Sequence, residues 1–188
     1  MPDPSLSEAT LVKRAIAGDA DAFGELYLRH LDAIYRYVYF RVGNVEDAED
    51  LTEQVFLKAW EALPGYRQRG NPFSSWLYRI AHNVVVDHHR RQQTARAIPL
   101  PDGNGGGWET NEPTTLDRVI AAEEAAALAS AIAQLPEEQQ QVIILRFIEG
   151  MSHAQVSRII GKSEGACRVI QHRALTALNR LLTGAEGS

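Results

Sequence analysis

The sequence predicts an all-α fold of two helical domains, at residues 1–94 and 119–188, joined by a flexible linker at 95–118. Three observations lead to this prediction. No segment alternates apolar and polar residues as a half-buried strand does. Apolar residues recur at helical spacing on both sides of the linker, between helix start and stop residues. The intervening run IPLPDGNGGGWETNEPTT is rich in Gly, Pro and Asn and has no period, which is typical of a linker.

Four helices are expected in the first domain, each preceded by a residue that can cap it. The capping residues are Ser7, Asp19 and Asn44, whose side chains can accept free backbone N–H groups, and Asn71, followed by Pro72 at the first helical position. Gly18, Gly43 and Pro64-Gly65 end the first three helices, and the fourth is expected to reach about Arg91.

The second domain is also expected to hold four helices. An Ala/Glu-rich helix begins near Leu116 and ends at Ala133, and Pro136 opens the next helix, which Gly150 ends. Ser152 and Gln155 form a capping box for a short helix that ends before Gly161. Ser163 then caps a final helix that reaches about Leu182.

The overall composition narrows the function class. The 188 residues are 45% hydrophobic, enough for a core, and no apolar run is long enough to span a bilayer. The N-terminus lacks the apolar stretch of a signal peptide, and Cys167 is the only cysteine, so a cytoplasmic protein without internal disulfides is expected. The net charge of −5 argues against coating nucleic acid by charge alone.

Charge is nevertheless distributed unevenly along the chain. Residues 46–53 carry five acids and no base, residues 67–91 carry five arginines and one acid, and residues 158–180 carry five bases and one acid. Two basic segments in an acidic chain indicate local, oriented contacts with phosphates.

The second domain contains the layout of a helix-turn-helix, in MSHAQVSRIIGKSEGACRVIQHRALTAL. At about 100° per residue, one face of the second helix is apolar and should pack inward: Cys167, Ile170, Ala174 and Leu178. The opposite face holds Gly165, Arg168, Val169 and His172, with Arg173 on its flank. Such arginines can contact guanine edges or phosphates, and Val169 can contact a thymine methyl group. Lys162 and the start of the helix can contact the phosphates of the DNA backbone. An ordinary helical hairpin with a solvated basic face is the alternative.

The acidic helix from Val45 is amphipathic. Leu51, Val55, Leu57 and Trp60 are expected to supply core, whereas Asp47, Glu49, Asp50 and Glu53 are expected outside. The acidic face is either a docking surface for a protein or simply a solubilising face.

The arginine-rich helix that follows has two faces as well. Phe73, Trp76, Leu77, Ile80 and Val84 are expected in the core, and Arg79, His82, Val86 and Arg90 lie opposite, with Asn83 at the border. The exposed stripe could follow a single strand of nucleic acid. The preceding loop, Tyr66 to Asn71 with Arg67 and Arg69, is polar and basic and could enclose an extruded base.

No catalytic, metal or cofactor site is expected. His82, His88 and His89 lack the i, i+4 spacing that places two ligands on one helix face, and no cysteine lies near them. GNGGG is not a phosphate loop, because no lysine follows it and no helix starts there.

The segments DAEDLTEQVFLKAW, FSSWLYRIAHNVVVDHHRR and LPEEQQQVIILRFIEGMSHAQVSRIIGKSEGACRVIQHRALTAL resemble, in this order, a bacterial sigma factor of the extracytoplasmic-function (ECF) group of the sigma-70 family. The resemblance covers both domains and implies a subunit that brings RNA polymerase to promoters and performs no bond chemistry itself. It also implies an anti-sigma protein as a regulatory partner.

The resemblance assigns a role to each charged segment. Asp47, Glu49, Asp50 and Glu53 would dock on the clamp helices of the polymerase β′ subunit. The −10 element would be opened and held by Tyr66, Arg67, Arg69, Asn71, Arg79, His82, Asn83 and Arg90. The −35 duplex would be bound by Lys162, Ser163, Glu164, Arg168, Val169, His172 and Arg173, in a domain that also contacts the β flap.

Two departures from the family pattern bear on these roles. Many relatives read Gln-Glu where this chain has Glu53-Gln54, and Lys/Arg-Ser-Arg where it has Arg168-Val169-Ile170. The second difference replaces a hydroxyl contact with a methyl contact and alters the expected −35 preference.

Two other functions fit parts of the sequence less well. A stand-alone helix-turn-helix regulator would bind an operator without polymerase, but it usually needs a dimer, and neither a heptad nor a dimer helix is evident. A hydrolase built on the histidines would need a metal, which their spacing disfavours.

Overall fold

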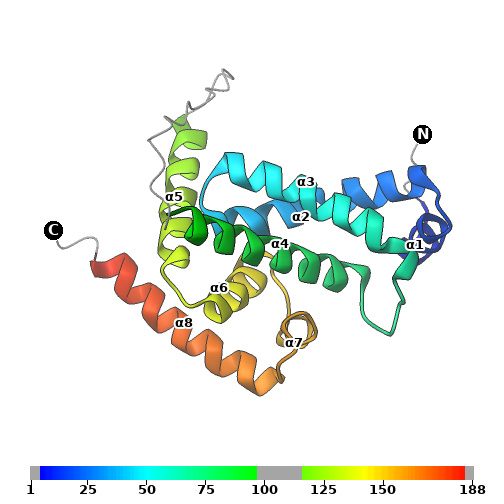
Figure 1. The fold of residues 1–188 in the computed structure, drawn as a ribbon. Helices are drawn as coiled ribbons and strands as arrows, with labels where there is room; N and C mark the ends of the chain where they lie inside the picture. The colour runs from blue at the N-terminus through cyan, green and yellow to red at the C-terminus, as the bar shows by residue number, and fades with distance from the viewer. Residues whose placement is uncertain (1–4, 97–115, 185–188) are drawn as a thin grey trace.

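The computed structural model describes residues 5–96 and 116–184, and this part of the chain forms helices and no strands. The first unit comprises α1 (Glu8–Ile16), α2 (Ala20–Val42), α3 (Val45–Ala62), the short 3₁₀ turn η1 (Leu63–Gly65) and α4 (Phe73–Arg96). The second comprises α5 (Leu116–Ala133), α6 (Glu137–Ile143), the π-helical turn η2 (Ile144–Ile148), α7 (His153–Ile160) and α8 (Glu164–Gly184). In Figure 1, α4 runs between α2 and α3 on one side and α6 and α7 on the other. No helix within the described ranges is both long and apolar enough to cross a membrane.

The predicted caps of the first three helices are confirmed by their hydrogen bonds. The side chains of Ser7, Asp19 and Asn44 accept the backbone N–H groups of Thr10, Ala22 and Asp47 at 3.3, 3.1 and 2.8 Å. Gly43 ends α2 with a φ of 81°, which a residue with a Cβ adopts only at a cost. The fourth helix begins one residue after Pro72, at Phe73, and continues past the expected end at Arg91 to Arg96.

The second unit also follows the predicted helix signals. Ser152 and Gln155 form the expected capping box, Gly161 turns the chain at φ 72°, and the Ser163 hydroxyl accepts the N–H of Ala166 at 3.1 Å. One detail was not predicted: the helix after Pro136 ends in the wider turn η2, where Glu149 N–H reaches back five residues to Ile144 C=O at 3.0 Å.

The core differs most from the prediction on α3. Leu57 and Trp60 were expected inside, but their side chains are 58% and 36% exposed, and Phe56 and Ala59 are buried instead. The reason is rotation about the helix axis: Leu51, Val55 and Ala59 recur every four residues and set the buried stripe, which leaves Leu57 on the other side. Trp60 lies at the edge and packs against Phe23, with ring centroids 4.9 Å apart.

The two units pack against each other rather than standing apart. Helix α2 contacts α5 and η2, helix α4 contacts α7, and buried side chains from both units join one hydrophobic cluster. Both ends of the predicted linker range lie in helices, α4 and α5, while residues 97–115 lie outside the described residues. The two units predicted to bind nucleic acid are therefore packed together within the described residues.

Candidate nucleic-acid and protein interfaces

A cavity of about 190 Å³ opens where the loop after η1 meets the start of α4. Five of the eight residues predicted to contact the −10 element line it: Tyr66, Arg67, Arg69, Asn71 and Arg79. The sequence did not predict Trp76 as a wall of this cavity. It was expected in the core, and it is only partly buried.

Two aromatic rings, those of Tyr66 and Trp76, line this cavity. Tyr66 is 8% exposed and packs its ring against Trp76 and Phe73, with centroids 4.7 and 5.7 Å apart. Burial raises the pKa of the Tyr66 hydroxyl, and the negative charge of Glu8 raises this pKa further. Arg67 folds back onto the loop and donates to the carbonyl oxygens of Pro64 and Tyr66. Aromatic rings in the wall, with arginines at the rim, can receive a stacked base and its phosphate.

The other three residues predicted for the −10 element lie elsewhere. Asn83 is exposed on α4. Arg90 is exposed, lies 4.0 Å from the carboxylate of Asp87, and borders a second cavity. His82 was expected on an exposed stripe, which is wrong: its ring is half-buried beneath α6.

The hydrogen bonds of His82 define its tautomer. Nδ1 receives the amide of Gln141 and, at 3.4 Å, the guanidinium of Arg41, so this nitrogen carries no proton. Nε2 lies 3.3 Å from the carboxylate of Glu137. Burial lowers the pKa of His82, the positive charge of Arg41 lowers it further, and Glu137 opposes both. The ring is therefore held neutral between the two units.

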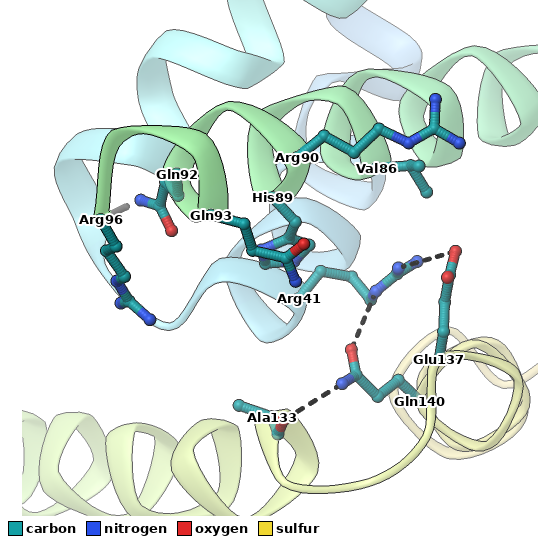
Figure 2. A pocket seen from close by; sticks show the side chains of 10 residues that line it. All are labelled: Arg41, Val86, His89, Arg90, Gln92, Gln93, Arg96, Ala133, Glu137 and Gln140. Carbon is teal, nitrogen blue, oxygen red and sulfur yellow. Dashed lines mark hydrogen bonds and ion pairs between the residues drawn. The ribbon is translucent and has the colours of Figure 1, made fainter. Parts of the chain in front are cut away.

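Arg41 is a further residue of this region that the sequence did not indicate. It ends α2 but is only 2% exposed, because α4 and α6 enclose it. Figure 2 shows its side chain pointing at Glu137 and Gln140 of α6, beneath the α4 residues Val86, His89 and Arg90. Since Arg41 lies 41 residues before His82, spacing along one helix could not have paired them.

The acids of α3 form a surface that α2 completes. Glu49, Asp50 and Glu53 are exposed, and Glu49 and Glu53 border a cavity of about 250 Å³ whose other wall is Tyr27, Leu31, Asp32 and Tyr35 of α2. Asp47 differs from the other three, because its carboxylate accepts from the Asn44 amide at 2.8 Å and lies 3.4 Å from the His88 ring. Exposed Leu28 and Leu57 add apolar area to the same pair of helices.

The predicted recognition helix is α8. Arg168, Val169, His172 and Arg173 are exposed on it, while Cys167, Ala174 and Leu178 are buried, as expected from the helical period. Ile170, expected on the same inward face, is only partly buried. Burial raises the pKa of the Cys167 thiol, in keeping with a packed, unreactive side chain. Near the helix start, Lys162 pairs with Glu138 at 2.8 Å and Arg168 with Glu164 at 3.5 Å.

A polar brace that the sequence did not indicate holds α8 in place. Gln171 accepts from Arg146 Nε at 3.1 Å, and its side-chain oxygen lies 2.8 Å from the ring of His153. The guanidinium of Arg146 also donates to the carbonyl of Met151. These bonds tie α8 to the turn before α7, and so orient the exposed face of the helix-turn-helix.

Two family models match the chain: Sigma-70 region 2 over residues 26–95 and Sigma-70, region 4 over residues 125–178. The chain is 40% identical over 172 residues to the ECF RNA polymerase sigma factor BldN of Streptomyces coelicolor. This match covers 92% of this chain and 64% of the length of BldN. It is 35% identical over 182 residues to the ECF RNA polymerase sigma factor SigD of Mycobacterium tuberculosis, covering 93% of this chain and 84% of SigD.

Solved structures resemble the fold over both units. CnrH, solved in complex with the cytosolic domain of CnrY, superposes with a TM-score of 0.71 and 27% identity over 94% of this chain and 97% of that one. The sigma factor RpoE of Bartonella quintana, solved with the anti-sigma factor NepR, shares the fold with a TM-score of 0.63 at 22% identity, over 86% and 96% of the two chains.

Proposed function

The chain belongs to the extracytoplasmic-function sigma factors of the sigma-70 family, and from this membership we propose how its three surfaces divide the work of promoter recognition. A sigma factor associates with core RNA polymerase and directs it to promoters to start transcription. The first unit is sigma region 2 and the second is sigma region 4. The polymerase carries out catalysis, and this chain works in the cytoplasm as a specificity subunit without an enzymatic reaction of its own.

The cavity between the loop and α4 holds an unpaired base of the −10 element. Its support is the combination of aromatic rings, Tyr66 and Trp76, with Arg69 and Arg79 at the rim, in a space of about 190 Å³. A base extruded from the duplex needs a pocket for its flat face and cations for the flanking phosphates. This is the single observation that carries the assignment of −10 recognition to this end of α4.

The acidic surface on α3 docks on the clamp helices of the polymerase β′ subunit. Glu49, Asp50 and Glu53 form no ion pair within residues 5–96 and 116–184, so their charges are free to meet a basic partner. The groove between α2 and α3 and the exposed side chains of Leu28 and Leu57 supply apolar contact beside the acids. An interface needs both, since exposed ion pairs by themselves contribute little.

Helix α8 binds the −35 element in the major groove, and its unit also contacts the β flap. Arg168 and Arg173 supply donors for guanine edges or phosphates, and the exposed Val169 offers a methyl surface to thymine. Ser163 and Glu164 lie at the start of the helix and Lys162 just before it, where the backbone N–H groups point toward a phosphate.

An anti-sigma protein is the partner expected to hold this chain inactive. The support is that CnrH, which resembles this chain over both units, was solved in complex with the cytosolic domain of CnrY. An inhibitor that keeps both units in place would block the surfaces that need polymerase and DNA.

The test is transcription from genomic fragments with core polymerase in the presence and absence of this protein. Initiation at defined start sites, only when both are present, is expected, and the shared −35 and −10 sequences would give the promoter preference. The alternative function, a stand-alone helix-turn-helix regulator, predicts instead tight binding to a duplex operator by the protein alone. Tight operator binding together with no stimulation of core polymerase would refute the proposal.

A further inference from the structure

We propose that Arg41 is a phosphate-contacting residue of the −10 DNA interface, and that α6 conceals it by placing Glu137 and Gln140 where the DNA backbone would bind. The proposal deepens the proposed function of region 2 and rests on it. It adds one residue to the DNA interface and makes the packed arrangement of the two units a self-blocked state.

The charge of Arg41 is compensated mainly by groups of the second unit. Its guanidinium donates to the Tyr37 hydroxyl at 2.9 Å and to the side-chain oxygen of Gln140 at 3.1 Å, and lies 3.6 Å from the carboxylate of Glu137. Of these three partners only Tyr37 belongs to its own unit. A charge that is 2% exposed needs compensation, and the only carboxylate paired with it within the described ranges is itself half-exposed.

Arg41 lies beside the face of α4 that is proposed to follow the −10 strand. Its guanidinium lies 3.4 Å from His82 Nδ1. Together with Val86, His89 and Arg90 it lines a cavity of about 440 Å³ between α4 and α6 (Figure 2). Glu137 is the only acid among the residues lining that cavity. Removal of α6 would therefore leave Arg41 on a basic surface continuous with the α4 stripe.

The groups that α6 presents to Arg41 resemble a phosphate in their hydrogen-bonding chemistry. Glu137 and Gln140 offer side-chain oxygens to a guanidinium, which are the same kind of acceptor as the oxygens of a phosphodiester. Arginine matches such acceptors through its planar array of donors. The carboxylate of Glu137 thus occupies the position of a phosphate, and Gln141 covers the neighbouring His82 ring.

Other contacts between the units hold this block in place. Glu149, which follows η2, accepts from Arg36 of α2 and from Tyr78 of α4. The guanidinium of Arg79, at the rim of the base cavity, donates to the carbonyl of Arg158 at the end of α7 at 2.5 Å. Region 4 therefore occupies Arg41, Arg79 and His82 together, so the −10 interface is complete only after the units separate.

The experiment opens the units at a point remote from Arg41 and then removes Arg41. Glu149→Gln removes the charge of this side chain and the oxygen that accepts from Arg36 Nη2 and the Tyr78 hydroxyl, without touching the DNA surface. Arg41→Gln in that background removes the charge but keeps hydrogen-bonding capacity, and Arg41→Lys keeps the charge. Small-angle scattering reports separation of the units, and far-UV circular dichroism with thermal melting reports that each variant is folded. The probe is a short fluorescein-labelled DNA single strand of mixed sequence, followed by anisotropy over a range of salt.

Glu149→Gln is expected to bind the single strand more tightly than the unaltered protein and to have a larger radius of gyration. Adding Arg41→Gln should weaken binding and flatten the plot of log affinity against log salt by about 0.7, the value for one lost single-strand phosphate contact. Adding Arg41→Lys should keep the slope.

The opposite results overturn the inference. If Arg41→Gln leaves affinity and slope of the opened variant unchanged, Arg41 is only a clasp between the units. If Glu149→Gln opens the units without increasing binding, α6 does not conceal the interface. Neither result touches the proposed function, which depends on promoter-directed transcription by the unaltered protein with core polymerase.

Discussion

Arg36 donates through Nε and Nη2 to the two carboxylate oxygens of Glu149, at 3.1 and 3.2 Å, across 113 residues of sequence. The pair joins region 2 to region 4, and Tyr78 adds a third bond to the same carboxylate at 3.2 Å. Because the Glu149 side chain is only 3% exposed, this carboxylate depends on partners from the other unit. The pairing shows that the packed arrangement of the two units is built from specific polar contacts as well as apolar ones.

Arg36→Ala is expected to weaken the packing of the two units by about 1–2 kcal/mol. This value is below the general range for hydrogen bonds to charged groups, because the Arg36 side chain is about half-exposed. Denaturation would measure it as a lower midpoint with loss of the single cooperative transition. Arg29→Ala, which removes an ion pair within α2 to Glu25, is the matched control and should leave the coupling of the units intact. Equal effects of both variants would contradict the role of the Arg36–Glu149 pair.

Acid should separate the two units. Burial, and then the charge of Arg41, lower the pKa of His82, and the same two causes lower the pKa of His89 most. The packed arrangement of the two units (the closed form) therefore binds fewer protons at these rings than the separated units (the open form). The closed form is therefore favoured fully above the ordinary histidine pKa of about 6.5, and this contribution is lost as pH falls through the lowered values. Glu137 opposes the shift at both rings and limits its size. Scattering at falling pH should show expansion.

His82→Gln with His89→Gln is the variant that separates this cause from others. It should flatten the pH dependence of the radius of gyration while leaving the arrangement at neutral pH largely unchanged, since glutamine can still accept from Gln141. Expansion of equal size in the variant and in the unaltered protein would assign the acid response to other groups.

Charge reversal on the acidic surface should abolish association with core polymerase. The structure favours Asp50→Lys with Glu53→Lys, because both side chains are exposed and form no ion pair in the described part of the chain. Asp47 is a poorer choice, since its contacts with Asn44 and His88 help to hold the start of α3. Co-purification with core polymerase measures the loss, with Glu61→Lys as an exposed acidic control farther along α3. Normal binding by a folded double variant would refute the docking surface.

Trp76→Ala should impair binding of the opened −10 strand more than it impairs core polymerase binding. The ring forms a wall of the base cavity, and loss of one base-stacking contact costs about 1–3 kcal/mol. Holoenzyme binding to a promoter fragment with a preformed single-stranded −10 region measures it. Trp76→Phe keeps the stacking face and should recover most of the affinity, whereas a purely structural role would make both variants melt early and lose both activities.

Arg168→Ala should cost about 1–3 kcal/mol at cognate −35 elements and little elsewhere if Arg168 contacts a base edge. Duplex binding by the holoenzyme to cognate and scrambled −35 sequences measures the difference. A loss of the same size on every sequence would assign Arg168 to a phosphate. Arg180→Ala, on an exposed position nearer the end of α8, is the matched control.

The sequence by itself determined the helices and the faces of most of them. Capping side chains such as Ser7 and Ser152 act within a few residues of where they stand, so their hydrogen bonds follow from local sequence. The exposed face of α8 follows from the helical period for the same reason. On α3 the period alone left the exact rotation open, which is why Leu57 was misplaced in the core.

Only the tertiary structure decided which charged residues meet. Trp76 joins the base cavity because Tyr66, from a separate segment, turns its ring onto it. Arg41 and His82 share their partners on α6 because the two units pack, and no pattern along one helix encodes a contact between residues 41, 82 and 137. Helix caps and helix faces depend on residues close together in the sequence, so they can be predicted from it. The pairing of buried charges depends on contacts between distant segments, and these contacts set which surfaces are free for polymerase and DNA.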